Sequence, residues 1–205
     1  MAPASTPTAA DEAANVDPIA LFNELFAAAR SSETADPTAA ALATADRDGR
    51  PSVRVVLVKS VDQRGFRFFT NLGSRKAREI EENPRAALCF HWPTLVHQVR
   101  IEGAVEPLPA AESDAYFAER PRDSQIGAWA SRQSAPLASR QLLEERVERA
   151  SERFAGGPVP RPPFWGGFRL VPEVIEVWSG RDYRLHDRQL FRREGGRWSV
   201  ERLYP

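Results

Sequence analysis

A valine-rich segment between two short turn sequences limits the folds open to this chain more than any other feature. Residues 51–62 read PSVRVVLVKSVD and are rich in the β-branched residues that favour extended strands. The preceding DRDGR and the following QRG each supply a glycine for a tight turn. Because hairpins join antiparallel strands, whereas parallel strands need long crossover connections, this segment predicts an antiparallel sheet.

Further segments extend this pattern along the chain. Apolar and alternating runs predict strands at 38–46, 66–71, 85–92, 96–108, 165–180, 183–194 and 197–205. End signals predict helices from Pro18, from Ser74, over 110–120 and around 139–157. The strand–helix alternation of a Rossmann domain is absent. We therefore expect a mainly β (α+β) fold, an antiparallel barrel flanked by helices, formed by a single domain at 17–205 behind a disordered tail at 1–16.

The charge balance excludes some classes of partner. Lys and Arg together number 28, as do Asp and Glu, so the formal net charge is zero. This balance disfavours nucleic acid or a membrane surface as the main partner. The chain has neither a basic segment followed by an apolar run at its start nor the roughly 18 apolar residues of a membrane span. We expect a cytoplasmic protein.

The sequence lacks the motifs that are typical of metal-dependent and nucleophilic catalysis. The single cysteine, Cys89, excludes an intramolecular disulfide and a multi-cysteine zinc site. His91, His97 and His186 are not at zinc spacing, so no metal is expected. No phosphate loop, nucleophile elbow or dinucleotide fingerprint is present. Any redox or group-transfer chemistry would therefore come from an organic cofactor.

Basic residues stand where a core strand would favour apolar ones. Arg54 and Lys59 lie five apart in the valine-rich strand, so they are expected on opposite faces. Either the ends of this strand are exposed and the cations reach solvent, or each cation contacts an anion on its own face.

A second group of basic residues opens a helix. Arg75 and Lys76 stand in the first turn after Ser74, where the helix dipole favours negative charge. A phosphate bound at that end would remove the conflict, and we favour this interpretation over a solvated helix, although Glu79, Glu81 and Glu82 follow.

Two further stretches carry polar groups suited to anions. Tyr116 and Arg120 share one helix face, and Pro121 is expected to end that helix so that Ser124 and Gln125 lie in a loop. Read as one strand, WSGRDYRLHDR (178–188) places three cationic side chains on one face: Arg184, His186 and Arg188. Either that face is solvated or something anionic lies on it.

Taken in order, these stretches resemble the pyridoxine/pyridoxamine 5′-phosphate oxidase family. The matching segments are RVVLVK, FFTNLGSRKA, QVRIEG, RPRDSQIGAWASRQS, FWGGFR and RLHDR, within about residues 17–205. The resemblance implies an FMN-binding split β-barrel that works as a homodimer with its sites at the subunit interface. It also implies oxidation of pyridoxamine or pyridoxine 5′-phosphate to pyridoxal 5′-phosphate, with O2 reduced to hydrogen peroxide.

The resemblance assigns site residues. It implies FMN contacts at Arg54, Phe69, Thr70, Arg75, Lys76, Gln98, Gln133, Ser134, Trp178 and Arg188. It implies substrate contacts at Lys59, Tyr116, Arg120, Ser124, Arg184 and His186, with Arg184 and His186 as the catalytic pair. The family often has tyrosine where Phe69 stands.

Two other functions stay open. One is an enzyme of the same fold that acts on another substrate, such as a phenazine precursor. A substrate without phosphate would leave Lys59 and Arg120 unpaired, which disfavours this reading. The other is a non-catalytic split-barrel protein that binds flavin or haem, which would have no need for Arg184 and His186.

Overall fold

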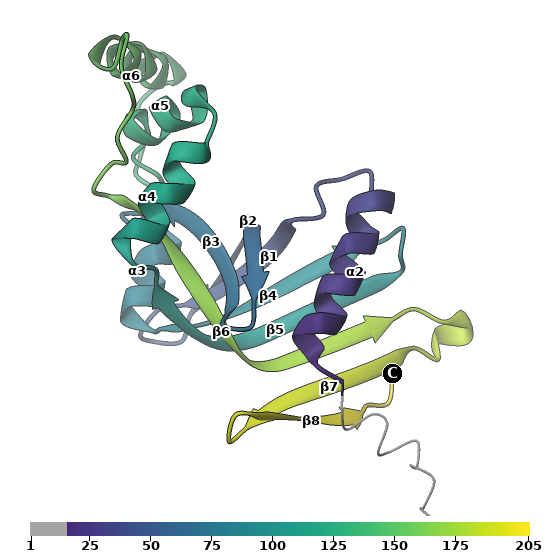
Figure 1. The fold of residues 1–205 in the computed structure, drawn as a ribbon. Helices are drawn as coiled ribbons and strands as arrows, with labels where there is room; N and C mark the ends of the chain where they lie inside the picture. The colour runs from purple at the N-terminus through teal and green to yellow at the C-terminus, as the bar shows by residue number, and fades with distance from the viewer. Residues whose placement is uncertain (1–15) are drawn as a thin grey trace, which may run out of the picture.

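Eight antiparallel strands form one sheet, six of which close into a barrel (Figure 1). The computed structural model describes residues 16–205, so the predicted tail lies outside the described residues except for Val16. The strands are β1 (Ala39–Ala45), β2 (Pro51–Asp62), β3 (Gly65–Asn71), β4 (Arg85–Trp92), β5 (His97–Pro107), β6 (Trp165–Ser179), β7 (Asp187–Glu194) and β8 (Arg197–Arg202). Their order is β3-β2-β1-β4-β5-β6-β7-β8, and a β3–β6 pairing closes the barrel. The predicted antiparallel barrel is confirmed.

Helices lie on two sides of the barrel. They are α2 (Pro18–Ser32), α3 (Arg75–Glu82), α4 (Ala110–Glu119), α5 (Arg122–Ala130) and α6 (Arg140–Arg153), with a short 3-10 turn η1 (Asp182–Arg184). Figure 1 shows α3 to α6 gathered at one end, with α2 on another side. No helix in the described part of the chain is long and apolar enough to cross a membrane.

The barrel interior is an aromatic core that α2 completes. Asp17 caps α2 by accepting a hydrogen bond from the Ile19 amide, as its sequence predicts. Phe22 is fully buried, with its ring 4.9 Å from that of Phe66 and 5.0 Å from that of Phe90. Burying one such side chain stabilises a fold by roughly 1.5–3 kcal/mol, so α2 adds to the same core that holds the strands together.

The predicted loop after Pro121 is wrong, because these residues form α5. Ser124 and Gln125 therefore lie on a helix. Local propensity for this helix is weak, since it contains Gly127 and has no side-chain cap. Tertiary packing supplies the stability: Ile126 is buried in a second apolar cluster with Phe117, Ala150, Val159 and Trp165.

The strands predicted at 165–180 and 183–194 correspond to β6 and β7, but the interpretation of 178–188 as one continuous strand is wrong. Trp178 pairs with Arg188 across a hairpin, so the chain reverses within this stretch. The reversal is fixed by the Gly180 amide, which donates to the Val96 carbonyl at 2.9 Å, and by an ion pair from Arg181 to Asp187. Arg184 stands in η1 with a φ of 62°, so Arg184, His186 and Arg188 do not share one strand face.

A glycine in β5 allows a bulge that the barrel needs. The β5–β6 register shifts between Glu102 and Gly103, and a Cβ on Gly103 would lie 1.9 Å from the Val171 carbonyl oxygen. Only a residue without a side chain fits so close to a neighbouring backbone.

Gly103→Ala should therefore lower the free energy of unfolding by about 1–3 kcal/mol or more, measured by urea denaturation. Gly127→Ala is the matched control, because no heavy atom lies within 4 Å of its Cβ position and alanine favours a helix. That variant should gain roughly 0.5–1 kcal/mol. Equal effects for the two substitutions would contradict the steric explanation.

Candidate active site

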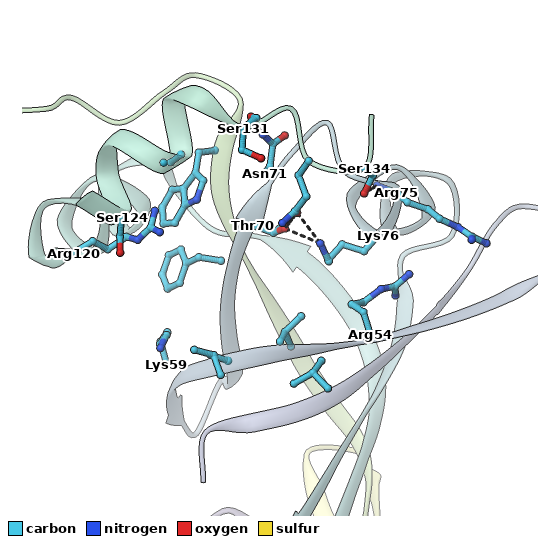
Figure 2. A pocket seen from close by; sticks show the side chains of 18 of the residues that line it. Arg54, Lys59, Thr70, Asn71, Arg75, Lys76, Arg120, Ser124, Ser131 and Ser134 are labelled. Carbon is cyan, nitrogen blue, oxygen red and sulfur yellow. Dashed lines mark hydrogen bonds between the residues drawn. The ribbon is translucent and has the colours of Figure 1, made fainter. Parts of the chain in front are cut away.

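A pocket of about 810 Å³ lies at the end of the barrel where α3, α4 and α5 gather. It brings together most of the residues predicted to bind ligands. From the predicted FMN set it is lined by Arg54, Phe69, Thr70, Arg75, Lys76, Gln133 and Ser134, and from the predicted substrate set by Lys59, Tyr116, Arg120 and Ser124. Figure 2 shows Lys59, Arg120 and Ser124 at one end and Arg54, Arg75, Lys76 and Ser134 at the other.

Arg54 and Lys59 therefore line one pocket, and the prediction that they face opposite sides of β2 is wrong. Every residue from Ser52 to Leu57 lines the pocket, although successive side chains of a strand point to opposite faces. The register of β2 with β3 then shifts between Val58 and Ser60, which leaves Lys59 as an additional residue in the strand. The two cations stand at opposite ends of the same cavity (Figure 2).

Lys76 is a buried cation held only by neutral groups. Its Nζ donates to Gln133 Oε1 at 2.8 Å and to Thr70 Oγ1 at 3.1 Å. No carboxylate in residues 16–205 forms an ion pair with it. Burial, together with the charge of Arg54 and against that of Glu79, lowers the pKa of Lys76 to about 8. A buried ammonium in such surroundings is stabilised by an anion.

The first turn of α3 meets the loop that follows α5. The Arg75 amide donates to Ser134 Oγ at 3.2 Å, and Ser134 has a left-handed φ of 70°. Ser74 occupies the predicted N-cap position, but its side chain makes no capping hydrogen bond. The start of α3, with Arg75 and Lys76, thus lies in the wall of the pocket, as the phosphate interpretation requires.

Arg120 forms the opposite end. Its Nη1 is buried and has no hydrogen-bond partner in the described part of the chain. Its guanidinium lies 4.9 Å from the centroid of the Trp165 ring. Burial lowers the pKa of Arg120, but an arginine stays charged in proteins. A charged group without hydrogen-bond partners costs free energy, so an anion bound at this end would also stabilise the protein.

Three stacked aromatic rings line the pocket beside Arg120. The Phe69 ring stacks on Tyr116 at 4.1 Å and on Trp165 at 5.4 Å, the latter at an interplanar angle of 5°. Gly167 pairs with Phe69 across the β3–β6 ladder, and a Cβ on Gly167 would lie 2.7 Å from the Phe69 ring. Glycine at this position leaves room for the aromatic stack, and the pocket combines two cationic ends with a planar apolar wall.

The remaining predicted residues lie elsewhere and form a second group, the C-terminal cluster: Gln98, Trp178, Arg184, His186 and Arg188. None of them lines the pocket. Gln98, Trp178 and Arg188 stand side by side on three adjacent strands. The rings of Trp178 and His186 lie 4.6 Å apart, and Arg188 pairs with the buried Glu176 at 2.8 Å.

The strand β6 separates the two groups. Trp165 opens this strand at the pocket and Trp178 lies near its other end. A strand rises about 3.3 Å per residue, so 15 residues extend up to roughly 45 Å. Figure 1 shows the β6–β7 connection far from α4 and α5. Pocket and C-terminal cluster therefore belong to different places on one chain.

Sequence reasoning missed the buried carboxylate behind the pocket. In the sequence, Glu79 entered only through the alternative of a solvated helix, which was not favoured, and its side chain is 5% exposed. Burial disfavours its charge, yet hydrogen bonds from Ser52, Thr44, Arg75 and Arg54 outweigh burial and lower the pKa of Glu79 to about 2. The spacing of Arg75 and Glu79, four residues apart on a helix, is the signal that could have found it.

Asn71 and Trp165 also line the pocket without having been assigned there.

The barrel and its pocket define a split-barrel protein suited to planar, anionic ligands. Residues 27–154 match the family model described as pyridoxamine 5′-phosphate oxidase. Residues 165–205 match the pyridoxine 5′-phosphate oxidase C-terminal dimerisation region. The chain belongs to the pyridoxamine 5′-phosphate oxidase family.

Individual relatives agree with this membership. The pyridoxine/pyridoxamine 5′-phosphate oxidase of Anaeromyxobacter dehalogenans is 60% identical over 92% of this chain and 96% of its own. That of Rubrobacter xylanophilus is 56% identical over 96% and 90%. Among solved structures, PhzG from Burkholderia lata 383 in complex with tetrahydrophenazine-1-carboxylic acid has a TM-score of 0.88 at 35% identity, covering 92% of this chain and 93% of that one.

The buried charge of Lys76 yields a prediction about stability and pH. Below pH 8 both folded and unfolded chains carry the Lys76 proton, so the folded state bears the full burial penalty. Between pH 8 and about 10.5 the folded chain loses the proton while the unfolded chain keeps it, so the penalty disappears as pH rises. Lys76→Met should therefore stabilise the ligand-free protein by roughly 2–3 kcal/mol at pH 7 and much less near pH 10.

Urea unfolding at the two pH values measures this difference. Lys59→Met is the matched control, because Lys59 is exposed and is the other lysine of the chain. It should show no comparable dependence on pH. A Lys76→Met effect that is the same at pH 7 and pH 10 would refute the buried-charge explanation.

Proposed function

We propose that this protein is an FMN-dependent oxidase that converts pyridoxamine or pyridoxine 5′-phosphate to pyridoxal 5′-phosphate, with O2 reduced to hydrogen peroxide. The observation that carries the proposal is the pair of cations at the two ends of one pocket: the buried Lys76, and the half-buried Arg120 with its buried, unpaired Nη1. Two phosphorylated ligands would supply an anion to each end. The relatives that are 55–60% identical to this chain carry the name of this activity.

The α3 end of the pocket fits the phosphate of FMN. Arg54, Arg75 and Lys76 supply positive charge, and Ser134 supplies a hydroxyl beside the first turn of a helix. Thr70 and Gln133 hold Lys76 in place, and the aromatic stack with Phe69 offers an apolar wall. The flavin, when bound, would accept the hydride from the substrate and pass the electrons to O2.

The other end fits the phosphate of the substrate. Lys59 and Arg120 supply charge, and Tyr116 and Ser124 supply hydroxyl groups from α4 and α5. The Arg120 guanidinium is already fixed by stacking on Trp165, so little side-chain freedom is lost on binding. Held by its phosphate, the substrate ring would be oriented within the same pocket as the flavin.

A second copy of the chain would complete each site with its C-terminal cluster. That cluster lies outside the pocket of its own chain, within residues 98–188, and mostly in the region that matches the dimerisation model. Around it, Tyr183 is 93% exposed and Leu185 68% exposed, as expected for apolar groups that a partner covers. Tyr183 and Arg184 also adopt left-handed φ values that cost of order 1–3 kcal/mol each, which a functional contact would explain.

Within such a homodimer, the C-terminal cluster has two roles. Gln98, Trp178 and Arg188 would contact the flavin, and Arg184 and His186 would orient the amine or alcohol and assist removal of its proton. The Arg181 amide donates to His186 Nδ1 at 3.1 Å, so Nε2 carries the hydrogen of the neutral ring and would donate a hydrogen bond that orients the substrate. We assign the whole of residues 17–205 to one oxidase domain.

The similarity to PhzG makes an enzyme that acts on a phenazine-type substrate the first alternative function. A phenazine-type substrate without a phosphate would leave the buried Nη1 of Arg120 unpaired. A non-catalytic flavin or haem carrier would have no use for Arg184 beside His186. Both alternatives therefore explain fewer of the residues than the phosphate oxidase does.

Steady-state kinetics test the substrate end. The FMN-loaded protein should convert pyridoxamine 5′-phosphate aerobically to pyridoxal 5′-phosphate and hydrogen peroxide. Arg120→Ala removes one charge-assisted phosphate contact, worth roughly 1.5–3 kcal/mol, so KM for the phosphorylated substrate should rise about 10- to 100-fold. FMN affinity should not change. Wild-type protein that binds FMN but forms no pyridoxal 5′-phosphate would disprove the proposed activity.

Mixing two impaired variants, assayed at a substrate concentration below the wild-type KM, tests whether sites are shared between subunits. Arg120→Ala damages the pocket and Arg184→Ala damages the C-terminal cluster. Random pairing makes about half of the dimers mixed, and each mixed dimer would contain one site with both parts intact. Co-refolded variants should regain about one quarter of the wild-type activity. No recovery above the sum of the separate variants would show that both residues act within one chain.

A further inference from the structure

One buried carboxylate connects the cationic groups at the α3 end of the pocket. Glu79 Oε2 accepts hydrogen bonds from Thr44 Oγ1 at 2.5 Å, from Ser52 Oγ at 2.6 Å and from Arg54 Nη2 at 3.2 Å. Its Oε1 accepts from Arg75 Nε at 2.7 Å. Both oxygens are thus used, and the two arginines are held by opposite sides of the same carboxylate.

Each arginine depends on Glu79 to a different degree. Arg54 also donates to the Leu42 carbonyl and to Thr44 Oγ1, so its guanidinium is fixed from several sides. The Arg75 side chain is 60% exposed, and Glu79 is its one ion-pair partner in the described part of the chain. Without Glu79, this long side chain would be free to move away from the pocket.

The charges at this end balance those of a phosphate monoester. Arg54, Arg75 and Lys76 carry three positive charges, and Glu79 offsets one of them. The remaining charge is close to the −1.5 to −2 that a phosphate monoester carries near neutral pH. Three cations without the carboxylate would repel one another and favour loss of the Lys76 proton.

Anchoring of α3 does not require Glu79. Ala77 is 4% exposed and Ile80 3% exposed, and both pack in the main core, so apolar contacts already hold the helix on the barrel. Burying a carboxylate costs free energy that a solvated residue would avoid. Its place behind three pocket cations is therefore better explained by the pocket than by the helix.

We propose that Glu79 is a positioning residue for the phosphate group of the flavin: it orients Arg54 and Arg75 toward the pocket and sets the net charge of that end. This inference rests on the proposed function, because it takes FMN as the ligand there. Glu79 itself does not line the pocket. It acts on the ligand through the two arginines.

Comparing FMN with riboflavin isolates the phosphate contribution. The two flavins differ by the phosphate alone, so the ratio of their Kd values reports on the phosphate end. In Glu79→Gln the single amide oxygen can face either the Thr44, Ser52 and Arg54 donors or Arg75, but not both. Quenching of flavin fluorescence by the stripped full-length protein should show FMN binding weakened roughly 10- to 100-fold and riboflavin binding unchanged.

Glu82→Gln is the matched control. Glu82 stands on the same helix, pairs with the exposed Arg47 at 3.4 Å and does not contact the pocket, yet the change in charge is the same. Its FMN-to-riboflavin ratio should equal that of the wild type. An unchanged ratio in Glu79→Gln, or equal weakening of both flavins, would overturn the proposed role.

A second variant keeps the test valid if Glu79→Gln does not fold. Thr44→Val removes one hydroxyl that donates to Glu79 and accepts from Arg54, without touching the pocket lining. The ratio of the FMN Kd to the riboflavin Kd should rise, as in Glu79→Gln but by a smaller factor, and a ratio equal to that of the wild type would count against the role of Glu79. If the wild type itself does not prefer FMN to riboflavin, the proposed cofactor site is wrong, which is a different outcome from failure of the Glu79 assignment.

Discussion

The pairing of β3 with β6 is the contact on which the rest of the molecule depends. It closes the barrel between segments far apart in sequence, with Phe69 opposite Gly167 and Asn71 opposite Trp165. The end of β3 leads directly into α3, so the same pairing places Lys76 within hydrogen-bond distance of Thr70, the residue that follows Phe69 in β3. The pairing that closes the barrel therefore also shapes the pocket, and Gly167 contributes to both because its missing side chain leaves room for the Phe69 ring.

The charges that line the pocket are unevenly compensated by the protein itself. Glu79 and its hydroxyl partners satisfy the arginines of one end from behind, while Lys76 and Arg120 keep unpaired charge directed at the cavity. An anionic ligand therefore gains the full interaction with these cations when it binds. A cation that was already paired within the protein would first have to give up that partner. In the proposed function, selectivity for phosphorylated molecules would follow from the unpaired charges of Lys76 and Arg120.

Much of the fold followed from local patterns, whereas long-range contacts decided what could not be predicted. The valine-rich β2 and the cationic start of α3 were predicted because periodicity and end signals are local. Helix α5 was missed because the apolar cluster around Ile126 stabilises it. The strand after Gly180 was expected from residue 183 but begins at Asp187, and this could not be predicted because the turn is fixed by Val96, more than eighty residues earlier. The burial of Glu79 depends on which face of α3 meets the barrel, and no pattern in its own segment decides that.

The length of β6 has a consequence for how activity depends on the amount of protein. The strand contributes Trp165 to the pocket and Trp178 to the C-terminal cluster, too far apart to meet within one chain. In the proposed dimer each site takes one end from each subunit, so an isolated chain has no complete site. At low abundance, where few chains are paired, the number of complete sites rises with the square of the chain concentration. Expression level would then control not only how much enzyme is present but what fraction of it works.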